Sequence, residues 1–406
     1  MGEGESAMYK PVEITENTYW IGVNDHETDL FEAVWPLPKG VSYNAYMILG
    51  KKVALIDTVK RFFWSRYVDN IERILPEGKT LDYLIVNHME PDHSGSIRAL
   101  TNRYPEMVIV GNKKTMEFLS GFYGITDKVE VIQDGDGLKL GGHTLKFHLT
   151  PMVHWPETMM TFDETTGVLF AGDAFGGFGA HEGGIFDDEI KPAYYLEEIR
   201  RYFSNIVGQY STMVQKAIAK LKDLDIRIIA SAHGIIWREN PQKVVDLYDR
   251  WSRYEAEEGV VIVYGSMYTH TQKMAEAAAR GLAEAGVKFI RLYDSARYHV
   301  SYIINDVWRF RGIILGSCTY NLGLFPPMAY VIHHLAEKSI KNRLLGLFGS
   351  YSWSGGAVKA LKHFAEDTKW QLIEPVVEVK CAPTTDELDQ CEELGHAMAM
   401  SLRNAM

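Results

Sequence analysis

The stretch HMEPDHSGS, residues 88–96, places two histidines and two carboxylates within its first six residues. It directly follows the apolar run LDYLIVN, residues 81–87, which is typical of a buried strand. The four polar side chains therefore come where a strand ends. Neighbouring carboxylates and imidazoles desolvate or repel one another unless a cation lies among them. The stretch thus predicts a metal site at the end of a strand.

The four residues in this stretch are His88, Glu90, Asp92 and His93. Alternate residues of an extended segment share a face, so the first three are expected to converge, with His93 following on the turn. A sheet that gathers its strand ends at one edge also gathers the polar residues that follow them. Three later apolar strands end in such residues, in TPMVHWPE, LFAGDAFGG and IASAHG: His154, Asp173 and His233.

Other histidines receive a structural interpretation, because a single histidine after a strand is more often a satisfied polar residue than a ligand. The loop 176–190, which contains His181, is interpreted as solvated. The histidines interpreted as structural are His143, His148, His299, His333 and His334.

Length and charge limit the class of protein. A chain of 406 residues is long enough for two domains. Its net charge of −11 argues against a nucleic-acid binder, which needs a basic surface. No apolar run approaches the length of a membrane span, and residues 1–15 lack a charged-then-apolar leader. Without a Cys-x-x-Cys pair, the three cysteines form neither a disulfide framework nor a four-cysteine metal module. A cytoplasmic enzyme is expected.

The pattern of strands changes near residue 256. Residues 1–256 contain strands in meandering groups and two predicted long helices, 193–222 and 241–256, which indicates an α+β sandwich. Residues 257–406 contain five short apolar strands that alternate with helical segments, a pattern typical of a doubly wound parallel sheet. The acidic segment YEAEEG, residues 254–259, is the predicted boundary between the two domains.

The second domain contains a candidate phosphate-binding loop. VVIVYGSMYTHTQKMAEAAA, residues 260–279, reads as a strand, a hydroxyl-rich loop and a helix. A helix N-terminus offers unpartnered N–H groups and a positive dipole to a phosphate. No G-x-G-x-x-G pattern is present, so a dinucleotide is disfavoured. The loop residues concerned are Ser266, Met267, Tyr268, Thr269, His270 and Thr271.

Two further strand ends complete this predicted cradle, because ligands of doubly wound sheets lie beyond the carboxyl ends of the strands. Residues 316–327 and 349–356 supply polar groups, two aromatic rings suited to stacking on a planar ring system (Tyr320 and Trp353), and glycines that allow close backbone approach. The alternative is that these are ordinary turns with core aromatics. The candidate residues are Ser317, Thr319, Tyr320, Asn321, Gly323, Ser350, Tyr351, Ser352, Trp353 and Gly355.

The motif H-x-E-x-D-H, with the later His, Asp and His, resembles the metallo-β-lactamase superfamily, whose fold is an αββα sandwich. The loop 266–271 is similar to the flavodoxin phosphate loop, with Thr269 in its glycine position. Together the two halves resemble the flavodiiron proteins over essentially the whole chain. The resemblance implies an FMN in the second domain and two non-haem iron ions in the first.

The resemblance also implies roles for single residues. It assigns His88, Glu90 and His154 to one iron, Asp92 and His233 to the other, and Asp173 as the bridge. His93 matches a position that is a ligand in some members, and Tyr202 matches a tyrosine near the site. Glu32 stands, on a loose alignment, where many relatives carry histidine.

The implied activity is reduction of dioxygen to water, of nitric oxide to nitrous oxide, or of both. The implied partners are a separate electron donor, first rubredoxin and second a reduced deazaflavin, and a second copy of the chain in a head-to-tail homodimer. The alternative is a zinc-dependent hydrolase with an attached flavodoxin-like domain. Glu90 argues against it, because catalytic zinc is well served by imidazole-rich ligands whereas redox-active iron tolerates mixed shells.

Overall fold

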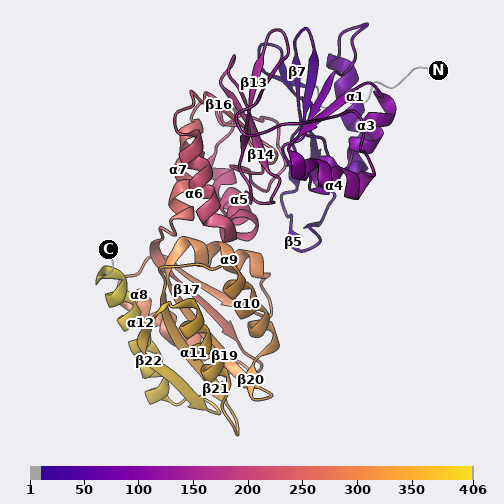
Figure 1. The fold of residues 1–406 in the computed structure, drawn as a ribbon. Helices are drawn as coiled ribbons and strands as arrows, with labels where there is room; N and C mark the ends of the chain where they lie inside the picture. The colour runs from indigo at the N-terminus through magenta and orange to yellow at the C-terminus, as the bar shows by residue number, and fades with distance from the viewer. Residues whose placement is uncertain (1–10, 405–406) are drawn as a thin grey trace, which may run out of the picture. The chain divides into compact units, whose positions relative to one another are not determined.

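The computed structural model describes residues 11–404 and divides the chain into two units (Figure 1). The first unit runs to Phe203 and takes in Thr212–Asp249, and the second comprises Ser204–Ser211 and the chain from Arg250 onward. The domain boundary near residue 256 stays a prediction. The prediction that residues 1–15 hold no secretion leader concerns mainly residues 1–10, which lie outside the described part of the chain.

Two sheets form the centre of the first unit. The larger has the order β1-β2-β7-β8-β9-β10-β11 and the smaller β12-β13-β14-β15-β16. The bounds of the larger are β1 Val12–Thr15, β2 Thr18–Trp20, β7 Tyr46–Leu49, β8 Val53–Ile56, β9 Tyr83–Ile85, β10 Val108–Gly111 and β11 Val129–Val131. Those of the smaller are β12 Gly137–Lys139, β13 Thr144–Leu149, β14 Met159–Asp163, β15 Val168–Gly172 and β16 Ile228–Ser231. Two short pairs complete the strands: β3 Val23–Asp25 with β6 Val41–Tyr43, and β4 Leu30–Phe31 with β5 Trp35–Pro36.

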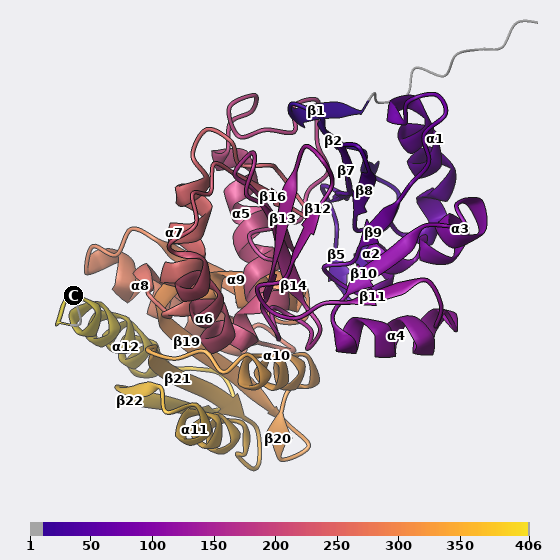
Figure 2. The ribbon, with the colours of Figure 1, turned by 45° about the horizontal axis from the view of Figure 1, so that its top comes forward.

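Apolar residues from both sheets form one core between them, including Ile48 and Ile85 from the larger sheet and Phe147 and Phe170 from the smaller. Helices α1, α3 and α4 lie beside the larger sheet, and α5, α6 and α7 beside the smaller (Figures 1 and 2). The predicted αββα sandwich is confirmed. The helices are α1 Trp64–Ile74, α2 Pro91–Ser94, α3 Ile97–Arg103, α4 Lys113–Tyr123, α5 Ala193–Tyr202, α6 Ser211–Leu221 and α7 Pro241–Ser252.

The single helix predicted over 193–222 is wrong. α5 ends at Tyr202, a π-helical turn covers Phe203–Val207, a 3-10 turn covers Gly208–Tyr210, and α6 follows. Gly208 lies against the indole of Trp308, where an added Cβ would meet ring carbons at 2.5 Å. The close approach of this ring requires a glycine, and a glycine weakens a helix interior. The second predicted helix also ends early, at Ser252.

The second unit is a parallel sheet of order β18-β17-β19-β21-β22 covered by helices. Strands β17, β18, β19, β21 and β22 pair in parallel throughout, which confirms the predicted doubly wound sheet. Its strands are β17 Glu257–Gly265, β18 Ile290–Asp294, β19 Phe310–Tyr320, β20 Gly323–Leu324, β21 Leu344–Tyr351 and β22 Gln371–Lys380. Its helices are α8 His270–Glu284, α9 Val300–Arg309, α10 Pro326–Glu337, α11 Ala357–Thr368 and α12 Thr385–Asn404. Between residues 11 and 404, no helix is both long and apolar enough to cross a membrane.

Candidate metal centre and flavin pocket

The seven predicted metal ligands lie at the ends of strands in the first unit or on the turns that follow. His88 and Glu90 follow β9, Asp92 and His93 lie on α2, and the other three lie in the loops after β13, β15 and β16. All except Asp92 are buried, and the Asp92 side chain is 13% exposed.

These side chains form two groups that could each hold a metal ion. The first consists of His88, Glu90, His154 and Asp173, and the second of Asp92, His93 and His233. Within each group the candidate ligand atoms lie within 4.8 Å of one another. Imidazole nitrogens and carboxylate oxygens in these numbers suit a transition metal such as iron.

Asp173 faces both groups. Its Oδ2 lies 3.0 Å from His154 Nε2 and 3.6 Å from His88 Nε2. Its Oδ1 lies 3.0 Å from His93 Nε2 and 3.7 Å from His233 Nε2. One carboxylate with an oxygen toward each group can bridge two metal ions.

The expectation that His88, Glu90 and Asp92 converge by alternation is wrong. Pro91 occupies the first position of α2, where its fixed φ favours a helix start. The alternation therefore stops at Glu90, and the turn carries Asp92 and His93 to the second group. His93 Nε2 lies 3.3 Å from Asp92 Oδ2, so His93 belongs to the second group geometrically.

The histidines and carboxylates of the metal centre stabilise one another in their charged forms. Burial alone would raise the pKa of Asp173, yet His93 and His88 hold that pKa well below its ordinary value. Burial alone would lower the pKa of His154, but Asp173 and Glu90 raise it to about 9. Burial likewise opposes a charged Glu90, and hydrogen bonds from His154 and His88 lower its pKa nonetheless. The site therefore favours ionised carboxylates at neutral pH.

Unsatisfied atoms show that the residues fit metal ions. The Nε2 atoms of His93 and His233 face each other at 2.9 Å, a separation that needs a shared proton or a cation. Both oxygens of Asp92 and Oδ1 of Asp173 are buried, and within residues 11–404 none of them has a hydrogen-bond partner. Buried polar atoms are almost always paired, and metal ions would pair these.

A cavity of about 780 Å³ opens onto this centre and is lined by Glu90 and Asp92 together with Glu32 and Tyr43. Glu32 accepts a hydrogen bond from Trp35 Nε1 at 2.9 Å. Burial first, and the charge of Glu90 second, raise the pKa of Glu32 to about 7. The structure thus places Glu32 beside a candidate ligand.

Tyr202 lies near the second group, and His181 is linked to the loop of His233 through Asn44. The Tyr202 ring centroid is 5.6 Å from that of His233, and its buried hydroxyl has no hydrogen-bond partner within the described residues. The solvated interpretation of His181 is wrong, because this side chain is buried and its Nε2 lies 3.2 Å from Asn44 Oδ1. Asn44 also donates to the backbone oxygens of Ser231 and Gly234 on either side of His233. The sequence offered no signal for this network, because its members lie far apart in the chain.

The candidate flavin pocket of the second unit is a separate cavity of about 320 Å³. Helix α8 begins at His270, and Thr269 before it makes no side-chain cap, which leaves the helix N–H groups to a phosphate. The buried hydroxyl of Ser266 has no partner within the described chain, so these residues fit a phosphate-bearing group. The predicted residues in its lining are Ser266, Met267, Tyr268, His270, Thr271, Thr319, Ser350, Tyr351 and Ser352.

The remaining predicted flavin residues lie outside this lining. Tyr320 is 44% exposed and Trp353 is 85% exposed, so both rings are accessible. Ser317 is buried and accepts a hydrogen bond from Phe325 N. Thr269, Asn321, Gly323 and Gly355 also lie outside the lining, whereas three residues not predicted from the sequence line it: Cys318, Cys381 and Ala382. Cys381 and Ala382 directly follow β22. They were not predicted, because the sequence pattern indicated only three strand ends as parts of the pocket.

Comparison with known proteins gives the same two halves. Residues 41–234 match the family model "ODP family beta lactamase", and residues 262–395 match the family model "Flavodoxin". The anaerobic nitric oxide reductase flavorubredoxin of Escherichia coli is 32% identical, over 95% of this chain and 81% of the relative.

Solved structures agree over the whole chain. Rubredoxin oxygen:oxidoreductase from Desulfovibrio gigas superposes with a TM-score of 0.93 at 28% identity, covering 98% of this chain and 99% of that one. The flavodiiron protein from Giardia intestinalis superposes with a TM-score of 0.92 at 26% identity, covering 99% and 98%.

The fold and the site define a two-domain flavoprotein with a binuclear metal centre. The chain belongs to the flavodiiron protein family and is an oxidoreductase. Its cofactors are FMN and a pair of non-haem iron ions.

Proposed function

We propose that this protein reduces dioxygen to water, nitric oxide to nitrous oxide, or both, at the di-iron centre. The single observation that carries the proposal is Asp173, whose two oxygens face two groups of buried ligands in a chain that also has a flavodoxin domain. The relatives named above are a nitric oxide reductase and an oxygen oxidoreductase, which supports the same substrates.

The proposed ligands follow the two groups. His88, Glu90 and His154 would hold one iron, Asp92, His93 and His233 would hold the other, and Asp173 would contribute one oxygen to each. When bound, the irons and FMN supply the electrons and a paired position for two substrate atoms. Dioxygen takes four electrons and four protons to give two waters. Two nitric oxide molecules take two electrons and two protons to give nitrous oxide and one water.

The protein's own residues keep water and stray reactants away from this chemistry. All of the ligands except Asp92 are buried, and the rings of Phe31 and Tyr202 lie against His233. The Tyr202 hydroxyl is a buried donor with no partner in the described chain, and we propose that it donates a hydrogen bond to the substrate. Interactions of this kind count for more in a site that excludes water.

The pocket of the second unit holds the FMN in this proposal. The N-terminus of α8 and the hydroxyls of Ser266 and Thr271 bind the phosphate. Tyr320 and Trp353, whose rings are accessible, would stack on the isoalloxazine. The residues after β19 and β21 approach the ring system through their backbone.

The electron donor is proposed from the names of the relatives. Rubredoxin appears in both "flavorubredoxin" and "rubredoxin oxygen:oxidoreductase", so a rubredoxin is the first candidate and a reduced deazaflavin the second. On the family resemblance we propose a head-to-tail homodimer in which each FMN serves the partner's irons. We place the protein in the cytoplasm.

The test is to count cofactors in protein purified without oxygen and then mix the reduced protein with each gas in a stopped-flow instrument. About two irons and one FMN per chain, with fast reoxidation by dioxygen or nitric oxide, are expected. Two zinc ions, or a reduced protein inert to both gases, would point to the zinc hydrolase, which the comparisons do not favour.

A further inference from the structure

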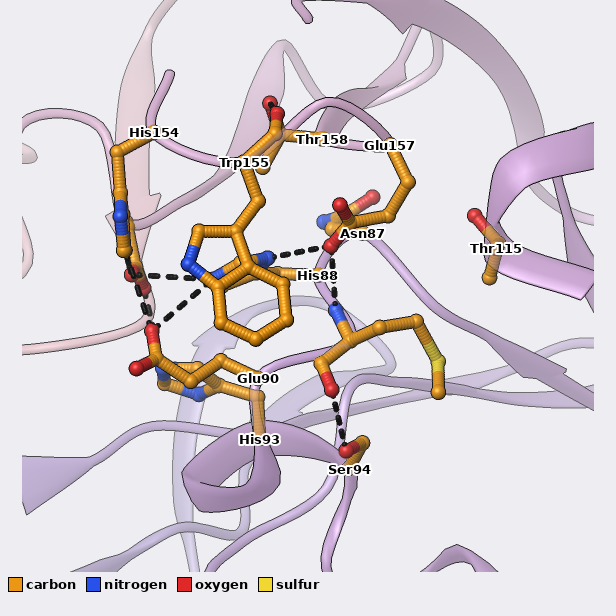
Figure 3. A network of polar contacts seen from close by, with 12 residues as sticks. Asn87, His88, Glu90, His93, Ser94, Thr115, His154, Trp155, Glu157 and Thr158 are labelled. Carbon is orange, nitrogen blue, oxygen red and sulfur yellow. Dashed lines mark hydrogen bonds and ion pairs between the residues drawn. The ribbon is translucent and has the colours of Figure 1, made fainter. Parts of the chain in front are cut away.

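One buried carboxylate near the metal centre is not in either ligand group. Glu157 lies in the loop between β13 and β14 and is 1% exposed. Its Oε1 lies 2.8 Å from His88 Nδ1 and accepts the backbone N–H of Met89 at 2.9 Å (Figure 3). Its backbone oxygen accepts from Asn112 Nδ2 at 2.5 Å, so Glu157 is held from both ends.

This contact fixes which nitrogen of His88 faces the metal. With a carboxylate oxygen accepting at Nδ1, the proton of a neutral ring stays on that nitrogen. Nε2, which faces Glu90 at 3.2 Å and Asp173, is then the nitrogen available to a metal ion. Figure 3 shows the His88 ring between Glu157 and Glu90, with Trp155 beside it. A carboxylate behind an imidazole ligand also increases the basicity of that ligand.

Within residues 11–404 the second group has no comparable carboxylate behind its histidines. His233 Nδ1 donates to the backbone oxygen of Ser42 at 2.7 Å, a neutral acceptor. His93 Nδ1 is buried and makes no hydrogen bond to any residue in the described range. The nearby carboxylate of Asp57 is occupied by the backbone N–H groups of Asn87 and His88, and it bonds to no imidazole nitrogen of the described chain.

We propose that Glu157 is a positioning residue that makes the two metal positions unequal. Through His88 it makes the position held by the first group bind its ion more tightly and favour the oxidised ion. The proposal rests on the ligand assignment of the proposed function. The inference adds that the two irons have different roles. The iron at the second group, which has no such carboxylate, is the one that is reduced more readily.

The substitution Glu157→Gln isolates the charge. Gln keeps an acceptor oxygen for His88 and Met89, and its amide takes the place of Oε2, which has no hydrogen-bond partner within residues 11–404. The matched control is Asp163→Asn. Asp163 forms the same kind of buried pair with His143, 2.7 Å between Oδ2 and Nδ1, and belongs to neither ligand group.

The first experiment is an anaerobic titration of the metal-free full chain with Fe²⁺ and, as a spectroscopic probe, Co²⁺. The wild type is expected to bind two ions with unequal affinity, seen as a tighter and a weaker phase of the titration. The tighter phase should vanish in His154→Ala, and the weaker phase should vanish in His233→Ala. Glu157→Gln should weaken the tighter phase about 10-fold or more and leave the other within about 3-fold. Two equal phases in the wild type, or equal weakening of both by Glu157→Gln, would overturn the proposal.

The second experiment follows the reduction of the iron-loaded protein by electron paramagnetic resonance at controlled potential. If Glu157→Gln lowers the affinity for the oxidised ion about 10-fold more than the affinity for the reduced ion, the reduction potential of one of the two iron couples rises by about 59 mV. Two unchanged reduction potentials in Glu157→Gln, or the same shift in Asp163→Asn, would contradict the inference. Protein with two irons and one FMN but two equal positions would overturn this inference alone, whereas protein that binds no iron would overturn the proposed function as well.

Discussion

The metal centre and the flavin pocket are built from different kinds of binding groups. Seven mostly buried side chains define the metal centre, and three carboxylate oxygens there, both of Asp92 and Oδ1 of Asp173, have no hydrogen-bond partner within residues 11–404. The flavin pocket is built from hydroxyls and a helix N-terminus, with exposed rings such as Tyr268 and Trp353, which are 79% and 85% accessible. The identity of single side chains therefore decides the first site, whereas shape and backbone decide the second.

Burial explains this difference. Removing one partner from a buried charged group leaves the other unpaired, which is costly in a medium of low dielectric constant. An exposed aromatic ring loses only its share of a stacking contact when it is replaced. Single substitutions should therefore have large effects at the metal centre and small effects at the flavin pocket.

The largest effect is expected for Asp173→Asn. A neutral amide cannot supply two anionic oxygens, so the iron content should fall from two to one or fewer per chain and turnover should drop by more than about 100-fold. The FMN content should stay near one. Elemental analysis and flavin absorbance measure both. The control is Asp188→Asn, at an exposed residue paired with Arg238, which should change neither the iron content nor the FMN content. Full iron content in Asp173→Asn would contradict the prediction that single side chains decide metal binding.

A buried histidine outside the ligand groups gives the next effect. Burial lowers the pKa of His181 to about 3 in the folded protein, whereas its ordinary value is 6.5. Because the unfolded chain then binds the proton more readily, the stability is complete above pH 6.5 and is lost as the pH falls toward 3. The slope approaches about 1.4 kcal/mol per pH unit.

Urea unfolding of wild type and His181→Gln between pH 7 and pH 5 measures this slope. The difference in free energy of unfolding between the two proteins should shrink as the pH falls, since the variant lacks the titrating group. A difference that is constant with pH would show that His181 has the same pKa in the folded and the unfolded protein.

A smaller effect is expected for Trp353→Ala. Loss of one stacking ring costs about 1 kcal/mol, so the dissociation constant of FMN should rise about 5-fold while the iron content stays the same. Fluorescence titration of the flavin-free protein measures it. Trp353→Phe should recover most of the affinity, and Tyr298→Ala, an exposed ring that packs against Tyr293, should have no effect.

The smallest effect is expected at Thr269, which has a φ of +70° in the phosphate loop. Glycine adopts this conformation without strain but loses more entropy on folding, so Thr269→Gly should raise the free energy of unfolding by less than about 1 kcal/mol. Thr269→Ala keeps the strain and should give no such gain. Thermal unfolding of the flavin-free protein distinguishes the two, and a loss of stability in the glycine variant would be the contrary result.

The sequence predicted the sheets well, because the alternation of apolar strands with helices is a local pattern. It also predicted that seven ligands would meet, because each of them closes or follows a strand. Local reasoning failed where packing decides the backbone. The helix over 193–222 is interrupted by a π-helical and a 3-10 turn over residues 203–210, where Gly208 lies against Trp308, a hundred residues later.

Two errors in the site have equally specific causes. Pro91 starts a helical turn, and this divides Asp92 from Glu90 although alternation had joined them. His181 sits in a segment rich in glycine and acidic residues, yet its contact is Asn44, far away in the chain. Glu157 was missed for the same reason, because its only signal is its distance from His88 in space.

The chain does not pass from one unit to the other at a single place. Residues Ser204–Ser211 belong to the second unit although α5 before them and most of α6 after them belong to the first. Gly208 packs on Trp308, and Lys338 donates to the backbone oxygen of Asn205. A protease that cuts only near residue 256 would therefore release a flavodoxin fragment that lacks one of its own segments. The gene cannot be divided at one point into two complete modules, so exchanging flavodoxin halves between relatives requires this eight-residue segment to be exchanged with them.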